Sequence, residues 1–295
     1  MGKVIVTDAG RRPAMAAGHV DVGGRAVSRI GFGAMRLPGV WGGPAYREPA
    51  LAVLRRAVEL GVQVIDTAWY YGHDVANRLV ADALRPYGDV VLATKLGYGN
   101  TSRGGLSVAV RPQQLRDGNE RDLRVLGVQT VPVTHLRWSG PDVADGVHFD
   151  EALGTMLELK AEGRIEHIGL SNVALAQLKR GLEQSAIATV SNAFSIGDQQ
   201  DHDVLDLCTE ESIPYLPFLP LGPRGGRTHP AVTRMATDLG VTPAQVSLAW
   251  LLGRSPMIVP IPGTGRMSHV EENVAAAGLV LSTESQQKLD AVGSS

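Results

Sequence analysis

The stretch Val62–Gly72, VQVIDTAWYYG, joins a buried strand to polar side chains at its end. Its first four residues are mostly β-branched and apolar, which is typical of a strand buried in a parallel sheet. Asp66 ends this strand, and Tyr71 follows on the next loop. A carboxylate and a phenol are poor material for a core, but they suit a site at the carboxyl end of a barrel strand. The stretch therefore predicts a parallel sheet with a functional site at its edge.

A second buried run, Val90–Thr94, also ends in a charged residue, Lys95. Because the carboxyl ends of barrel strands meet at one face, Asp66, Tyr71 and Lys95 are expected to lie together. A phenol titrates near pH ~10, but an ammonium held by a carboxylate lowers that pKa and improves the phenol as a proton donor. The three residues are predicted to form one acid catalyst. Taken singly, each would more simply be a capping, packing or surface residue.

Apolar runs and amphipathic helical runs alternate along the chain. The expected strands are Ile30–Met35, Val62–Asp66, Val90–Lys95, Thr130–Arg137, Ile165–Ser171, Ala188–Asn192, Ile213–Phe218 and Met257–Ile261. Eight βα units without a linker predict a (β/α)8 TIM barrel as a single domain over residues 19–295, after a flexible lead-in at 1–18. A doubly wound dinucleotide fold is the rival. It is disfavoured because GFG at 31–33 is followed by Arg36 where the third glycine of G-x-G-x-x-G should stand.

Composition limits the classes of partner. The net charge is −2, so there is no bulk electrostatic case for nucleic acid or an anionic membrane. The single cysteine, Cys208, excludes an internal disulfide and fits a reducing compartment. No apolar run suits a signal peptide or a membrane span, so a cytoplasmic location is expected. The eight histidines lack ligand spacing, and no metal is expected.

Several segments carry a family resemblance. DTAWYYG, VLATK, GRIEHIGLSN and IPGTGRMSHVEEN occur in this order and resemble the aldo-keto reductases, with a likeness from about Val27 to about Ala291. PYLPFLPLG and QVSLAWLLGRSP are most similar to the bacterial NADPH-dependent pyridoxal reductases. The resemblance implies carbonyl reduction by hydride transfer from a nicotinamide.

The resemblance also implies catalytic roles. Tyr71 would protonate the carbonyl oxygen, Lys95 would lower the pKa of Tyr71, and Asp66 would hold Lys95 in place. The fourth position of the family is a histidine at the end of the fourth strand, but here Arg137 stands there and His135 lies two residues earlier. With a strand period of two, both side chains point to the same face. The pyridoxal reductases have Asn-Leu-Arg at this point, which the sequence HLR resembles, and whether His135 or Arg137 fills the position stays open.

A larger set of residues is assigned to the cofactor by the same resemblance. Ser171 and Asn172 match the pair that binds the nicotinamide amide, and Ser191 stands where the family usually has Gln. Phe218 matches the aromatic residue that stacks on the nicotinamide. The remaining positions are Leu221 and Gly222 near the pyrophosphate, Gly263, Thr264, Arg266 and His269 near a 2′-phosphate, and Glu272 and Asn273 at the adenine. Arg266 before a helix N-terminus favours NADPH over NADH.

Four aromatic residues after strand ends are candidate walls of a substrate pocket: Trp41, Tyr70, Tyr98 and Trp138. The predicted function is NADPH-dependent reduction of an aldehyde or ketone, with pyridoxal as the most specific candidate for this small-molecule carbonyl substrate. One alternative is a cofactor-binding regulatory subunit of the same fold, like the β subunits of potassium channels. Another is a barrel lyase or isomerase that uses Lys95 as a Schiff base. The sequence does not indicate an oligomeric state.

Overall fold

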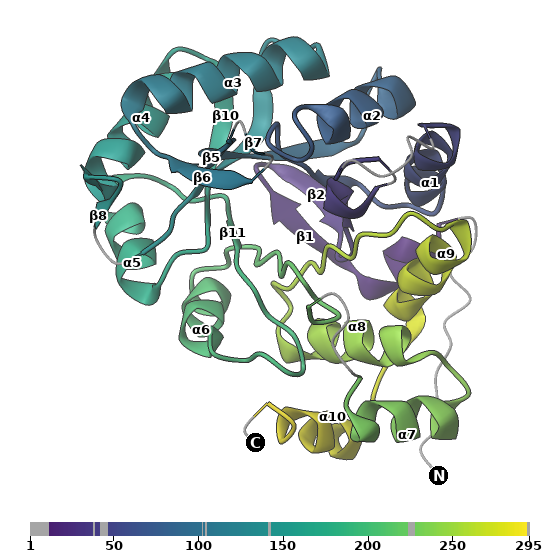
Figure 1. Cartoon of the computed structure of the whole chain (residues 1–295). Coiled ribbons are helices and arrows are strands. Elements are labelled where there is room, and N and C mark those ends of the chain that lie inside the picture. Colours follow the sequence, from purple (N-terminus) through teal and green to yellow (C-terminus); the bar gives the residue numbers. More distant parts are fainter. Residues whose placement is uncertain are drawn as a thin grey trace.

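Six parallel strands lie side by side in one sheet (Figure 1). The computed structural model describes residues 12–37, 39–41, 47–101, 103, 105–140, 143–223 and 228–293. In spatial order the strands are β11 (Thr189–Ser191), β10 (Ile165–Ser171), β7 (Val131–Arg137), β5 (Val91–Asn100), β4 (Val64–Asp66) and β3 (Phe32–Gly33). Each neighbouring pair is parallel, so the chain must cross over between successive strands.

Two single-residue bridges close this sheet into a barrel. Tyr215 pairs in parallel with β11 and with Ile258. The amides of Gly31 and Gly33 then donate to carbonyl oxygens of two prolines that follow Ile258, at 2.9 and 3.4 Å. The ring therefore has eight strand positions, which confirms the predicted (β/α)8 barrel.

Several of the predicted strands are shorter than expected, and three of them are reduced to two residues or to single bridges. Ile213–Phe218 and Met257–Ile261 form only bridges, because their prolines have no N–H to donate to a ladder. Those prolines are Pro214, Pro217 and Pro260. Ile30–Met35 ends early because Ala34–Arg36 forms a 3-10 helix, η2. This short helix lies at the carboxyl end of the barrel, and its last two residues line the cavity found there.

Helices surround the strands on the outside (Figure 1). They are α1 (Arg47–Glu59), α2 (Val75–Leu84), α3 (Pro112–Leu126), α4 (Phe149–Ala161), α5 (Leu175–Gln184), α6 (His202–Glu210), α7 (Pro230–Leu239), α8 (Pro243–Arg254), α9 (Met267–Ala275), η3 (Ala276–Gly278) and α10 (Thr283–Asp290). Their apolar faces pack inward; Leu54 of α1 and Leu153 of α4 are fully buried. None of these described helices combines the length and the apolar character needed to cross a membrane.

A two-stranded hairpin closes the amino-terminal end of the barrel. β1 (His19–Val22) and β2 (Arg25–Ser28) pair in antiparallel register across a turn at Gly23 and Gly24, which both have positive φ. The valines of this hairpin pack against apolar residues inside the barrel, among them Val64 and Val133. Other short pairings lie outside the barrel, between β5 and β6 (Leu106–Ala109) and between β8 (Val143–Ala144) and β9 (Val147–His148). The hairpin closes the amino-terminal end of the barrel, so the carboxyl end is the one at which a ligand can bind.

The expected flexible lead-in is only partly within the described residues, because residues 1–11 lie outside them. Its later part, Pro13–Ala17, forms a 3-10 helix, η1. Ala14 is fully buried, and its amide donates to the carbonyl oxygen of Leu60 at 3.0 Å. This part of the lead-in therefore packs on the barrel through the buried side chain of Ala14.

Candidate active site

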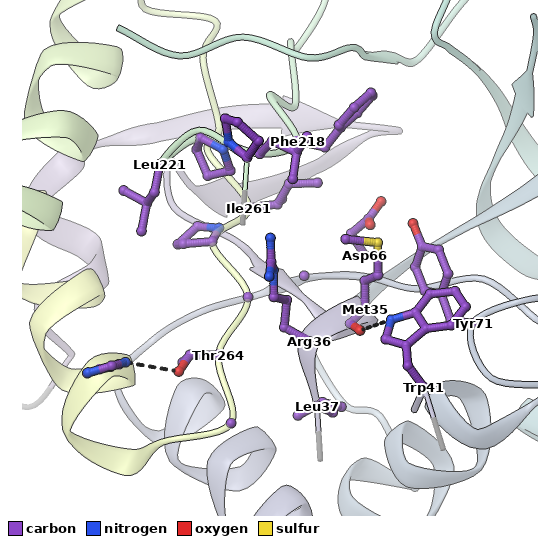
Figure 2. A pocket seen from close by; sticks show the side chains of 18 of the residues that line it. Met35, Arg36, Leu37, Trp41, Asp66, Tyr71, Phe218, Leu221, Ile261 and Thr264 are labelled. Carbon is purple, nitrogen blue, oxygen red and sulfur yellow. Dashed lines mark hydrogen bonds between the residues drawn. The ribbon is translucent and has the colours of Figure 1, made fainter. Parts of the chain in front are cut away.

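The carboxyl ends of the strands open into a cavity of about 1120 Å³ (Figure 2). Its walls come from the segments after β3 and β4, from the loop that follows Phe218, and from the chain that leads into α9. The predicted site residues that line it are Trp41, Asp66, Tyr70, Tyr71, Arg137, Phe218, Leu221, Gly222, Gly263, Thr264, Arg266 and His269. Residues from most of the length of the chain thus meet at one end of the barrel.

Asp66 and Lys95 form a buried ion pair beneath this cavity. They face the interior from neighbouring strands, β4 and β5, and their side chains are 4% and 1% exposed. Lys95 Nζ donates to both carboxylate oxygens of Asp66 at 2.5 Å and to the carbonyl oxygen of Thr67 at 3.3 Å. Burial raises the pKa of the Asp66 carboxyl, and the charge of Lys95 opposes that increase. The predicted contact between these two residues is present.

Tyr71 lies above the ion pair with its hydroxyl at the cavity (Figure 2). Lys95 Nζ is 5.3 Å from the centroid of its ring, and the hydroxyl makes no hydrogen bond within the described residues. The chain turns sharply after it at Gly72, where φ is +67° and a Cβ would meet the carbonyl oxygen of Val40 at 1.8 Å. Only glycine permits this close approach, which sets the loop that carries Tyr71 against the segment before Trp41.

The acidity of Tyr71 differs from the prediction. Its pKa is raised above the usual value, first by burial and then by the negative charge of Asp66, while Arg137 opposes the increase. The expected lowering by Lys95 is not found, because the charge of Lys95 is balanced by the carboxylate that binds it. Tyr71 therefore keeps its proton at neutral pH.

His135 is a buried structural residue rather than part of the cavity wall. Its Nδ1 lies 3.1 Å from the carbonyl oxygen of Thr94 and its Nε2 lies 2.8 Å from Thr189 Oγ1. Because a carbonyl only accepts, Nδ1 carries the proton and Nε2 accepts from the threonine. The His135 ring fits because the residue facing it on the neighbouring strand is Gly169. A Cβ added at Gly169 would lie 2.5 Å from the ring. Burial, then Lys95, lowers the pKa of His135 to about 3.

Arg137 is the one of the two fourth-position candidates that lines the cavity. Its Nη1 donates to Ser171 Oγ at 3.2 Å, and its guanidinium carbon lies 4.9 Å from the Phe218 ring centroid and 5.5 Å from that of Tyr98. Tyr98 also forms a short hydrogen bond with Ser139 and, although predicted as a pocket wall, is a support for Arg137. These contacts hold a permanent cation at the cavity that Tyr71 also lines, where its charge acts to lower the pKa of Tyr71.

Trp138 does not form the predicted pocket wall. It is fully buried and packs edge-on against Phe149, with ring centroids 5.3 Å apart. Side chains alternate along β7, so Arg137 faces the interior and the next residue faces the helices. The aromatic side chain of Trp138 therefore belongs to the core outside the barrel.

The other predicted cofactor residues are not among the described residues that line the cavity. Ser171 and Ser191 lie opposite each other on β10 and β11. The Ser171 hydroxyl accepts a hydrogen bond from Arg137. The Ser191 hydroxyl is buried and has no hydrogen-bond partner among the described residues. Asn172 donates to the carbonyl oxygen of Trp138 at 2.8 Å. Glu272 and Asn273 lie on α9, beyond its first turn.

Several lining residues were missed by the sequence reasoning. The most polar is Arg36, accompanied by Met35, Leu37, Leu106, Pro220 and Pro262. In the sequence, Arg36 stands where the third glycine of a G-x-G-x-x-G motif would be, and no site role was predicted for it. The useful signal was a charge directly after a barrel strand, the same signal that identified Asp66 and Lys95.

Among the described residues, no group of three or more His, Cys, Asp or Glu side chains is placed to hold a metal ion.

Comparison with known proteins places the chain in a family. Residues 29–294 match the sequence profile of the aldo/keto reductase family. A pyridoxine 4-dehydrogenase from Escherichia coli is 37% identical over 284 residues, covering 94% of this chain and 99% of the relative. A solved aldo-keto reductase from Klebsiella pneumoniae, in complex with NADPH, has a TM-score of 0.78 at 28% identity, covering 93% of this chain and 94% of that one. The fold is also that of a glycerol dehydrogenase from Gluconobacter oxydans, with a TM-score of 0.81 at 21% identity over 94% and 95% of the two chains. The chain belongs to the aldo/keto reductase family and is an oxidoreductase.

Proposed function

We propose that the protein reduces a carbonyl compound with NADPH and that Tyr71 protonates the substrate oxygen. The observation that carries this proposal is the Tyr71 hydroxyl at the cavity, above the buried Asp66–Lys95 pair and beside Arg137. Bound NADPH would supply the hydride that the carbonyl carbon accepts. Tyr71 enters the reaction protonated because its pKa is raised. An alkoxide is a stronger base than a phenolate, so the proton leaves Tyr71 only as charge develops on the substrate oxygen.

The residues around the cavity fit this cofactor. The cavity is larger than the roughly 300–1,000 Å³ of most small-ligand sites, as a dinucleotide plus substrate requires. Arg266 stands directly before the N-terminus of α9 and forms no ion pair within the described residues, so it is available to a phosphate. Phe218, at the end of the cavity away from Arg266, offers the face of its ring to the nicotinamide. The Ser191 hydroxyl, which has no hydrogen-bond partner among the described residues, is a donor that the nicotinamide amide would satisfy.

A Schiff-base mechanism is disfavoured by the position of Lys95. Such a lysine must be neutral and must reach the substrate carbonyl. Lys95 is 1% exposed, is held by both oxygens of Asp66, and is separated from the cavity by the Tyr71 ring. Its geometry suits a fixed cation that stabilises the site.

The pocket favours a flat aromatic aldehyde of the pyridoxal type. Trp41 is 50% exposed at the cavity rim, with its ring centroid 6.2 Å from that of Tyr71, and its indole donates to the carbonyl oxygen of Met35 at 2.9 Å. Leu106, 44% exposed, adds apolar surface. A flat ring between these side chains would bury apolar area on both faces. The name of the Escherichia coli relative, pyridoxine 4-dehydrogenase, supports the same substrate class.

A turnover screen tests the function and its rival together. The loss of NADPH absorbance is followed with pyridoxal, benzaldehyde and short aliphatic aldehydes, and pyridoxal is expected to give the highest kcat/KM. Tight NADPH binding without reduction of any of these compounds would support the cofactor-binding regulatory subunit instead. A preference for short aliphatic aldehydes would remove the assignment of substrate class and leave the reductase.

Arg266→Ala is expected to weaken NADPH binding while leaving NADH binding nearly unchanged. A charge-assisted contact to the 2′-phosphate contributes about 1.5–3 kcal/mol, or roughly 10- to 150-fold in Kd. Titration of intrinsic fluorescence with each nucleotide measures both constants. Equal losses for the two nucleotides would show that Arg266 does not read the 2′-phosphate.

Arg137→Met and His135→Asn are expected to differ sharply. Removing the cation at the cavity should lower kcat/KM by roughly 10- to 150-fold, since contacts of charged groups contribute about 1.5–3 kcal/mol. His135→Asn should change kcat/KM only a few-fold and cost about 1–3 kcal/mol of folding stability, because it removes a buried link between strands. Steady-state kinetics and urea unfolding separate the two effects.

The pH profile supplies a second test of the same assignment. Because the pKa of His135 is lowered to about 3, the ring stays neutral through the working range, and kcat should show no inflection near pH ~6.5. On unfolding, His135 gains a proton below about pH 6.5, so its contribution makes the free energy of unfolding fall as pH decreases from there. A folded but inactive His135→Asn protein beside a fully active Arg137→Met protein would reverse the assignment.

A further inference from the structure

The loop that carries Tyr71 has a strained backbone. Gly72, His73 and Asp74 follow Tyr71 directly, and all three have positive φ, of +67°, +52° and +71°. This left-handed region is unfavourable for residues with a Cβ, although histidine and aspartate tolerate it better than most. A loop strained in this way keeps one conformation only where contacts from elsewhere in the fold determine it. Those contacts therefore also determine where the Tyr71 hydroxyl lies.

Arg121 of α3 contacts both ends of this loop. Its Nε donates to Oδ1 of Asp74 at 2.7 Å, and its guanidinium carbon lies 4.9 Å from the ring centroid of Trp69. The amide of Asp74 also donates to the carbonyl oxygen of Trp69 at 2.7 Å, which joins the two ends directly. The Asp74 side chain is 3% exposed, so water and salt screen its ion pair with Arg121 less than a surface pair. Arg78, 68% exposed and 3.8 Å away, is a weaker partner of the same carboxylate.

Helix α3 leaves space for the Trp69 ring. Gly118 lies one turn before Arg121, and a Cβ added there would stand 2.8 Å from Nε1 of Trp69. Glycine inside a helix is unfavourable compared with alanine, but here the absence of a side chain lets the indole approach the helix. The indole therefore rests against α3 at Gly118 and against the guanidinium of Arg121.

The Trp69 ring is linked to the Tyr71 ring through Tyr70. Trp69 and Tyr70 pack edge to face with ring centroids 6.0 Å apart, and Tyr70 and Tyr71 pack in the same way at 5.1 Å. Tyr70 is 1% exposed, and a closely packed interior transmits a displacement of one ring to the next. A shift of Trp69 would therefore reach the ring that carries the reactive hydroxyl. Trp69, Asp74 and Arg121 do not line the cavity, so this link acts from outside it.

We propose that Arg121 is a positioning residue for the reaction, which holds Trp69 and Asp74 and thereby sets the Tyr71 hydroxyl at the substrate oxygen. This inference rests on the proposed function. A proton donor must lie about 2.6–3.2 Å from its acceptor, and a misplacement of about 1 Å can lower a rate about a hundredfold. A planar guanidinium can pair with a carboxylate and stack on an indole at the same time, so arginine suits this role.

The test compares Arg121→Met with a matched control, Arg116→Met. Arg116 lies on the same helix, its side chain is 31% exposed against 34% for Arg121, and it pairs with Glu158 and Glu162 of α4 rather than with the loop. Arg121→Met should lower kcat for carbonyl reduction about 10- to 100-fold and leave the Kd of NADPH within about twofold. Arg116→Met should leave both quantities within about twofold. Circular dichroism melting confirms that each variant is folded.

A double-mutant cycle shows whether Arg121 acts through Tyr71. In the Tyr71→Phe background the hydroxyl is absent, so adding Arg121→Met should lower the remaining kcat by less than about twofold. An equal loss of kcat in both backgrounds would mean that Arg121 acts independently of the hydroxyl, and the positioning role would be rejected.

A second variant covers the case in which Arg121→Met does not fold because the buried Asp74 carboxylate has lost its main partner. Asp74→Asn/Arg121→Met removes both charges, and asparagine tolerates the positive φ at this position. The same loss of kcat and the same unchanged Kd of NADPH are expected for it.

The outcomes separate this inference from the function on which it rests. Wild-type protein that reduces none of the carbonyl compounds, or a Tyr71→Phe variant with normal turnover, would overturn both. A Tyr71→Phe variant that loses activity, beside a folded Arg121→Met variant that keeps wild-type kcat, would overturn only the role of Arg121. A fall in kcat that the Arg116→Met control shares would also reject it.

Discussion

Tyr71→Phe is expected to lower kcat by about 10²–10⁴-fold while leaving the Kd of NADPH nearly unchanged. The hydroxyl makes no hydrogen bond within the described residues, so its removal breaks no contact of the protein. The ring keeps its neighbours Trp41 and Tyr70, whose centroids lie 6.2 and 5.1 Å away. The work assigned to this hydroxyl is confined to the transition state, so the loss should appear in kcat. Steady-state kinetics and fluorescence titration measure the two quantities.

A matched tyrosine provides the control. Tyr87 is only partly buried, lies away from the cavity, and donates to the carbonyl oxygen of Leu126 at 2.7 Å. Tyr87→Phe should cost about 1 kcal/mol of folding stability and leave kcat unchanged. If Tyr71→Phe retained near-normal turnover, another group would have to donate the proton, and the central assignment would fail.

Lys95→Met is expected to lower the free energy of unfolding by about 3–5 kcal/mol at neutral pH. The substitution leaves the Asp66 carboxylate buried without its cation, and urea unfolding monitored by circular dichroism measures the loss. Without Lys95 the pKa of Asp66 rises further, so the folded variant takes up a proton that the unfolded chain does not hold. Its stability should therefore decrease as pH rises above about 4, the pKa of an aspartate in the unfolded chain.

The double variant Asp66→Asn/Lys95→Met separates an unpaired charge from lost packing. Removing both charged partners of a buried pair is far less costly than removing one. The double variant should therefore be more stable than Lys95→Met, although its kcat stays low because the charges beside Tyr71 are gone. If its destabilisation were instead the sum of the two single losses, the ion pair would not be the cause of the Lys95→Met effect.

The barrel and the place of its site follow from local patterns in the chain. Eight apolar runs separated by amphipathic helices leave few ways to bury both faces of a parallel sheet. Asp66 and Lys95 interrupt such runs at their ends, and the carboxyl ends of parallel strands meet at one face. Their contact at 2.5 Å is therefore a consequence of sequence position together with the fold class.

The orientation of Trp138 is predictable from the sequence alone. An Arg137 that reaches the site has to face the interior of the barrel, and side chains alternate along a strand, so Trp138 has to face the helices. The short pairing of the proline-rich runs near Tyr215 and Ile258 is likewise predictable from the sequence. Prolines have no N–H to donate, so these runs form only single bridges. Both corrections required no knowledge of tertiary contacts.

Local patterns in the chain specify the barrel, the end at which its site lies, and the charged and phenolic side chains at that end. Which of these side chains reach the cavity, and in what electrostatic state, depends on contacts that form when the chain folds. His135 and Arg137 share one face of one strand, yet Thr94, Thr189 and the space above Gly169 hold the histidine below the site. The pKa of Tyr71 depends likewise on burial and on the charges of Asp66 and Arg137, which come from other parts of the chain. Strand patterns are local properties of a chain, whereas desolvation and Coulomb interaction depend on distances that exist only after folding.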